Sequence, residues 1–176
     1  MAPGWRQKRV LAPEPLGVAL RHAESVPTSD AIASLADWSP WLPFDDAAVS
    51  APCLPGVYLA RQGQLGTLVY VGMAGERRGQ GIRGRLTVYR RGKAAVSGLG
   101  EAVLDRALAD ATFVHGHLEQ LLAGQPKRAA VWAQDALRWA DLHIRWAVTP
   151  DRPAAVRLER AVLDASAASP LWNRAR

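Results

Sequence analysis

The chain has 176 residues and a formal net charge of +6, and 49% of its residues are hydrophobic. This length suffices for one domain with a hydrophobic core, whereas two independent cores would both be marginally stable. A single cysteine, Cys53, excludes an intrachain disulfide, and no apolar run is long enough to span a bilayer. We therefore expect a cytoplasmic protein without a membrane partner. The excess of basic over acidic residues favours polyanionic partners.

The first 53 residues are predicted to be an N-terminal extension that packs on the remaining domain, residues 54–176. The extension is rich in proline and alanine. It contains one short helix candidate at about residues 29–38, where Ser29 or Asp30 supplies a capping oxygen. Its tryptophans are expected to cover core surface, because they are too few and too scattered for a base-stacking platform.

An antiparallel hairpin is predicted next, from two β-rich runs at residues 55–61 and 67–72. The loop between them is short and contains glycine, which suits a hairpin turn. The side chains that share a face by period-two alternation are Tyr58 and Ala60 on the first strand, and Leu68, Tyr70 and Gly72 on the second. Two tyrosines are thereby brought toward one surface.

The second half of the chain is predicted to be mostly helical. One helix runs from Gly84 to about Arg91, and further helices follow at about 101–122, with a break near Gly116, and at about 126–140.

The chain then returns to the sheet and ends on a helix. Residues 142–148 alternate apolar and polar side chains, which indicates a third strand. Asp151 is placed to cap a last helix, which runs to about Ala167.

A basic stretch lies around the first of these helices, opposed in sequence only by Glu76. Such a cluster either contacts a phosphate backbone or forms a solvated basic helix face, and charge alone does not separate the two. The residues that we predict to contact nucleic acid are Arg77, Arg78, Arg83, Arg90, Arg91 and Lys93.

Two charged residues have no partner on their own helix. The neighbours of Glu159 at three and four residues' distance are all apolar, so its carboxylate should meet a cation, a tertiary salt bridge or a metal. Arg85 has no carboxylate one turn away either. The two charges either bind and polarise a phosphodiester or pair with each other.

The order of several short motifs resembles the GIY-YIG nuclease superfamily over about residues 54–176. The Arg-Leu-x-x-Tyr form is most similar to the N-terminal nuclease module of the bacterial excision-repair incision subunit. The motifs are Gly56-Val57-Tyr58, Tyr70-Val71-Gly72, Arg85-Leu86-Thr87-Val88-Tyr89, Glu159 and Asn173.

This resemblance implies an α+β fold with a small three-stranded antiparallel sheet flanked by helices, and a DNA endonuclease; RNA is not excluded as a substrate. It implies one Mg²⁺ or Mn²⁺ ion held by Glu159. Tyr58 or Tyr70 would deprotonate or orient the attacking water, and Arg85 would stabilise the transition-state charge. The remaining residues it assigns are Tyr89, for positioning, and Asn173, which would hold the final segment or a phosphate oxygen.

Two features depart from the family pattern. Met73 stands where the repair enzymes carry a lysine directly after the second tripeptide. Residues 93–140 form a longer helical insertion than the minimal fold requires.

Parts of the sequence are compatible with three other functions. The glycines of residues 79–84 match a dinucleotide-binding motif, but no βαβαβ alternation follows. Residues 78–84 also resemble the coenzyme A loop of GNAT acetyltransferases, although Arg83 stands where that loop has glycine or alanine. A catalytically inactive nucleic-acid-binding protein is the third alternative.

Overall fold

The computed structural model describes residues 30–76, 79–96 and 98–174, and these form an α+β fold. The sheet has four antiparallel strands in the order β1-β4-β2-β3. The strands are β1 (Leu42–Pro43), β2 (Gly56–Gln62), β3 (Leu68–Ala74) and β4 (Leu142–Val148). The predicted hairpin is confirmed as β2 and β3, and the predicted third strand is β4.

The sheet differs from the prediction in two details. It has four strands instead of three, because Leu42 and Pro43 from the N-terminal region pair with β4. The expectation that Leu68 shares a face with Tyr70 is wrong: the register shifts where Arg61 pairs with Leu68, and Leu68 packs on the other side of the sheet. A bulge of this kind inserts one extra residue and reverses the side-chain alternation beyond it.

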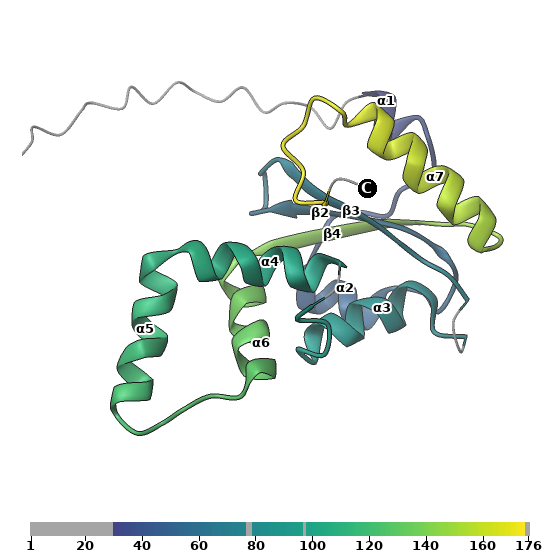
Figure 1. The fold of residues 1–176 in the computed structure, drawn as a ribbon. Helices are drawn as coiled ribbons and strands as arrows, with labels where there is room; N and C mark the ends of the chain where they lie inside the picture. The colour runs from purple at the N-terminus through teal and green to yellow at the C-terminus, as the bar shows by residue number, and fades with distance from the viewer. Residues whose placement is uncertain (1–29, 77–78, 97, 175–176) are drawn as a thin grey trace, which may run out of the picture.

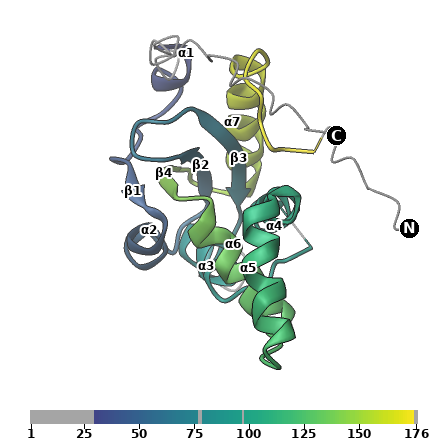
Figure 2. The ribbon, with the colours of Figure 1, turned by 90° about the vertical axis from the view of Figure 1, so that its left-hand side faces the viewer.

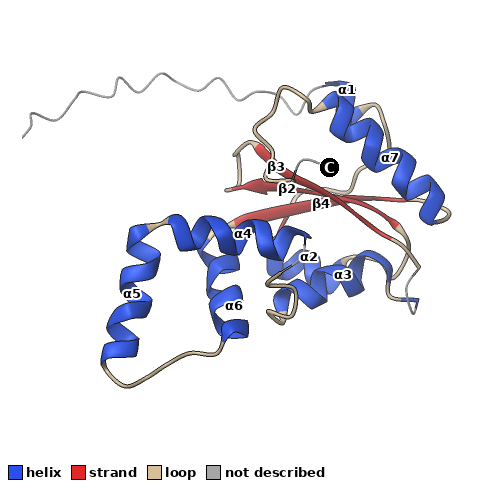
Figure 3. Cartoon of the chain, viewed as in Figure 1, coloured by secondary structure: helices blue, strands red, loops and turns tan. Residues whose placement is uncertain are grey.

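Helices cover both faces of the sheet (Figures 1 and 3). On one face lie α2 (Phe44–Ser50), α3 (Gly81–Arg90) and α4 (Gly98–Ala109), which enclose a core with Tyr58 and Ala60. On the other face lie α1 (Asp30–Ala33) and α7 (Arg152–Ala165). A second core forms there around Val57, Leu59 and Val71. The predicted cap of the last helix is present, since the Asp151 side chain accepts a hydrogen bond from the backbone of Ala154.

The predicted helical insertion contains α4, α5 (Ala111–Leu122) and α6 (Ala129–Trp139), and α5 and α6 project away from the sheet (Figures 1 and 2). The expected break near Gly116 is wrong, because the chain turns at Asp110 instead. Its carboxylate accepts a hydrogen bond from the backbone of Phe113 and so starts α5. In the part of the chain that is described, no helix is long and apolar enough to cross a membrane.

Asp135 joins the two projecting helices. Its carboxylate lies 2.8 Å from Lys127 Nζ and 3.2 Å from His117 Nε2, and it also pairs with Arg138. Burial alone would raise the pKa of Asp135, but the hydrogen bonds and charges of Lys127, His117 and Arg138 hold it below its ordinary value. The ionised carboxylate therefore stabilises the folded insertion.

We expect Asp135→Asn to lower the free energy of unfolding by about 1 kcal/mol near neutral pH. The pKa of Asp135 is lower in the folded than in the unfolded state, so its carboxylate stabilises the protein at pH values above the unfolded-state pKa of about 3.9. This stabilisation is lost as the pH falls through the folded-state pKa. Urea unfolding near neutral pH and at about pH 3 should thus give a difference between wild type and variant that shrinks in acid. The exposed Asp164→Asn is the control. An equal loss at both pH values would mean that charge is not responsible.

Candidate active site

Tyr58 and Tyr70 lie on neighbouring strands and face the same side of the sheet. Their exposed fractions are 1% and 8%, and their rings stack with centroids 6.3 Å apart and planes 22° apart. Gly72 is paired with Tyr58 across the two strands. A Cβ atom at residue 72 would collide with the Tyr58 phenol and lie 2.9 Å from the Tyr70 ring. Glycine is therefore required here to make room for the tyrosines.

The helix α3 adds Arg85 and Tyr89, which lie one turn apart and so share a face. The Tyr89 hydroxyl is 2.9 Å from that of Tyr58, and both side chains are 1% exposed. The Arg85 guanidinium carbon lies 5.0 Å from the centroid of the Tyr89 ring, within range of a cation–π interaction. The side chains from β2, β3 and α3 thus form one connected group.

Gly98, the first residue of α4, closes this group. A Cβ atom there would lie 2.6 Å from the Tyr89 hydroxyl, 2.9 Å from Arg85 Nη2 and 3.2 Å from the Tyr70 hydroxyl. The three polar groups therefore converge on one point. Gly98 also has a φ of +56°, which only glycine adopts readily. We call Tyr58, Tyr70, Arg85 and Tyr89 the tyrosine–arginine cluster.

The electrostatics of the cluster keep Arg85 charged and Tyr58 neutral. Burial, followed by the neighbouring Tyr89 and Tyr70, raises the pKa of Tyr58 well above its ordinary value, against the opposing effect of Arg85. Burial disfavours the charged form of Arg85, but Tyr89 and Tyr58 raise its pKa overall. Arg85 belongs to none of the ion pairs between described residues, and its Nε is buried without a hydrogen-bond partner.

Glu159 lies on the opposite side of the sheet. It is 7% exposed and belongs to α7, whose apolar side chains pack on Val57, Leu59 and Val71. The structure therefore does not place Glu159 within the tyrosine–arginine cluster. Because β3 is an edge strand, the two sides of the sheet meet at its outer edge. Among the described residues, no group of three or more histidine, cysteine or acidic side chains could hold a metal ion.

Asn173 lies at that outer edge. Its Oδ1 accepts a hydrogen bond from the Val71 backbone N–H at 3.0 Å, and its Nδ2 donates to the Val71 carbonyl at 2.7 Å. Trp172 N–H also donates to the Val69 carbonyl. This arrangement favours the role in which Asn173 holds the final segment over the role in which it binds a phosphate oxygen.

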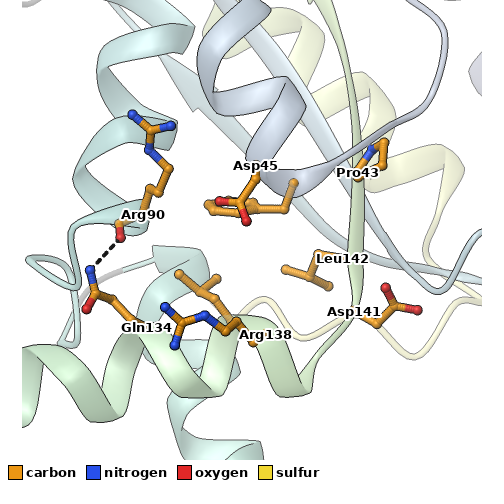
Figure 4. Close-up of a pocket in the computed structure, with 9 residues that line it drawn as sticks. Pro43, Asp45, Arg90, Gln134, Arg138, Asp141 and Leu142 are labelled. Atoms are coloured by element: carbon orange, nitrogen blue, oxygen red, sulfur yellow. Dashed lines mark hydrogen bonds between the residues drawn. The ribbon is translucent and has the colours of Figure 1, made fainter.

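The described members of the basic stretch have different surroundings. Arg83 donates from Nε to the Ala51 carbonyl at 2.6 Å. Arg90 lines a pocket of about 400 Å³ between α2, α3 and α6, together with Asp45 and Arg138 (Figure 4). Arg83, Arg91 and Lys93 are exposed and Arg90 is half-buried, while Arg77 and Arg78 lie outside the described residues.

Two helical N–H groups of the segment proposed for coenzyme A are already hydrogen-bonded within the protein. Ile82 N–H donates to the Leu54 carbonyl and Arg83 N–H to the Pro52 carbonyl, each at 3.0 Å. A pyrophosphate-binding helix start needs free N–H groups. This observation weighs against the acetyltransferase alternative.

One cluster of basic side chains was not predicted from the sequence. Arg61, His143 and Arg145 gather beside Trp38 and Trp41 on the α7 side of the sheet. The available signal was the alternation in residues 142–148, which points a histidine and an arginine to the same face. Whether His143 and Arg145 meet a third basic residue depends on which strand pairs with residues 142–148, and the sequence does not specify that strand.

No family model, no curated protein and no solved structure matches this chain. What the fold defines is therefore the class alone, an α+β protein with an antiparallel sheet between two layers of helices.

We expect Gly98→Ala to destabilise the protein more than Gly124→Ala. Both glycines have positive φ, so alanine costs about 1–2 kcal/mol at either position. Only at Gly98 does the new methyl group also meet the cluster, which should add about 1–3 kcal/mol. Gly124 has nothing within 4 Å of its added Cβ and is the matched control. Equal losses in denaturant unfolding would show that the cluster has room to adjust.

Proposed function

We propose that this protein is a divalent-metal-dependent endonuclease that hydrolyses DNA phosphodiester bonds, similar to the GIY-YIG nucleases. The observation that carries the proposal is the arginine within the tyrosine–arginine cluster. Arg85 is held by aromatic side chains and paired with no carboxylate among the described residues, so its charge is available to a phosphate. The ordered sequence motifs support the same function.

Arg85 would stabilise the negative charge that develops on the transferring phosphate. A guanidinium offers several N–H donors in a planar fork, which matches two phosphate oxygens at once. The contact with the Tyr89 ring restricts its orientation before substrate binds. Such preorganisation lowers the cost of arranging charge in the transition state.

The three tyrosines would have different roles. The raised pKa of Tyr58 disfavours it as a base, so we assign its hydroxyl to the hydrogen bond that positions Tyr89. Tyr70 is the most exposed of the three, and its hydroxyl lies beside Gly98 together with Arg85 Nη2. We therefore assign Tyr70 to orienting the attacking water.

Glu159 would hold the metal ion. A single carboxylate suits Mg²⁺ or Mn²⁺, because Mg²⁺ in particular retains several waters and is completed by substrate phosphate oxygens. When bound, the ion would neutralise charge on the leaving oxygen. Because one carboxylate leaves the remaining coordination positions to water and phosphate oxygens, we expect metal binding to depend on nucleic acid.

The substrate would reach both groups at the outer edge of β3. Tyr70 and Gly72 face the tyrosine–arginine cluster, while Val71 faces the α7 side. The edge at Val69 and Val71 is taken by Trp172 and Asn173. A phosphodiester would therefore approach beyond Asn173, next to Met73. Arg85 is half-buried, and the proposal requires its guanidinium to be reached from this side.

We expect Arg85→Ala to slow single-turnover cleavage of plasmid or branched DNA by roughly a hundredfold or more, and to weaken DNA binding several-fold at most. Arg85→Lys should fall between wild type and alanine, because it keeps the charge and loses the fork. The exposed Arg157→Ala on α7 is the control for total charge. If Arg85→Ala cleaves like the control, Arg85 has no part in the chemistry.

We expect cleavage to need Mg²⁺ or Mn²⁺ and to stop on chelation. Glu159→Gln keeps the size of the side chain and should abolish metal-dependent cleavage while leaving the far-ultraviolet circular dichroism unchanged. A normally folded Glu159→Gln protein that cuts at the wild-type rate would remove Glu159 as the ligand. Nucleic-acid binding without cleavage under any metal would instead identify the inactive binding protein.

A further inference from the structure

Unpartnered polar atoms are concentrated away from the tyrosine–arginine cluster. Among the described residues, the buried side-chain nitrogens without a hydrogen-bond partner are Arg61 Nε, Arg85 Nε, His143 Nδ1, Arg145 Nε and Arg145 Nη2. All but Arg85 Nε belong to three residues that lie close together. Leaving a buried donor unpaired is costly, and more so for a charged group. This group therefore calls for an acceptor that the described part of the protein does not supply.

The three residues occupy one face of the sheet. Arg61 is paired with His143 across β2 and β4, and Arg145 is paired with Leu59, so their side chains point to the same side. Leu59 belongs to the core beneath α7. The three side chains are each partly exposed.

Two tryptophans fix the planes of the arginines. The Arg61 guanidinium lies 4.5 Å from the centroid of a Trp41 ring, and Arg145 lies 4.9 Å from Trp41 and 5.0 Å from Trp38. The Trp38 indole is itself held by a 2.9 Å hydrogen bond from Nε1 to the Ile32 carbonyl. Stacking satisfies the flat faces of the guanidinium groups, but their N–H edges still need oxygen acceptors.

The charges in this group repel one another. Burial and then the nearby Arg61 lower the pKa of Arg145, and burial also lowers the pKa of Arg61. None of the ion pairs formed between described residues includes either arginine. Two adjacent cations without a carboxylate create a local field that favours an anion.

We propose that Arg61, His143 and Arg145 form a phosphate-binding site on the face of the sheet opposite the tyrosine–arginine cluster. Phosphate is the anion that fits best, because it presents several oxygens to planar donor groups in different directions, whereas a single carboxylate presents two. The phosphate is carried either by a nucleic-acid backbone or by a small molecule. This site does not depend on the proposed nuclease function.

The test is a titration of the full-length ¹⁵N-labelled protein, followed by the indole signals of Trp38 and Trp41 and the side-chain signals of Arg61 and Arg145. Inorganic phosphate and a single-stranded oligonucleotide without terminal phosphates are the two ligands. We expect phosphate to shift these signals selectively. A shift with the oligonucleotide identifies the backbone as a source, and a shift with phosphate alone identifies a small molecule.

The variants separate the site from general charge. Arg61→Gln and Arg145→Gln should each lower the affinity for the ligand by about tenfold or more, equivalent to about 1.4 kcal/mol. The ligand is whichever of the two shifts the signals. Arg145→Lys, which keeps the charge, covers the case in which Arg145→Gln fails to fold. The exposed Arg157→Gln should bind like the wild type.

Two results would overturn the proposal. One is no selective shift with phosphate or oligonucleotide, whether or not a polyglutamate peptide shifts the signals. The other is an equal loss of affinity in Arg157→Gln. The salt dependence of oligonucleotide binding tests the backbone contact. The slope of log affinity against log salt concentration should be smaller by about one in Arg145→Gln than in the wild type if Arg145 contacts a backbone phosphate.

Discussion

The hydrogen bond between the hydroxyls of Tyr58 and Tyr89 is the contact on which the organisation of this face of the sheet depends. It joins β2 to α3 inside the core, where an unpaired hydroxyl would be costly. Tyr89 in turn accepts a hydrogen bond from the backbone of Leu99 and so fixes the beginning of α4. One phenol thereby links the sheet, the helix that carries Arg85 and the helical insertion.

Glycine makes this arrangement possible. Tyr58 fits because Gly72 has no side chain opposite it, and the polar groups converge because Gly98 has none above them. A tripeptide ending in glycine is thus a packing requirement in this fold, whatever the chemistry of the site. The same argument explains why tyrosine and glycine occur together in the hairpin, since the ring of one fills the space that the other leaves.

Local patterns predicted the parts of the structure that local physics controls. Alternation placed Tyr58 and Tyr70 on one face, and the carboxylate of Asp151 caps α7 as its position indicated. The bulge before Tyr70, the pairing of Leu42 with β4 and the turn at Asp110 were not predicted. Each depends on tertiary neighbours. The position of Glu159 across the sheet from Arg85 was also beyond the sequence, because helical periodicity gives the buried side of a helix but not which face of a sheet it covers.

The C-terminal segment has a consequence for the behaviour of the protein in solution. An edge strand such as β3 presents unpaired backbone groups that can template pairing with another chain. Here the Asn173 amide imitates a neighbouring strand toward Val71, and the Trp172 backbone does the same toward Val69. The segment therefore acts as a terminator of the sheet. A chain shortened before Trp172 would expose the backbone groups of Val69 and Val71 at this apolar edge and become prone to self-association.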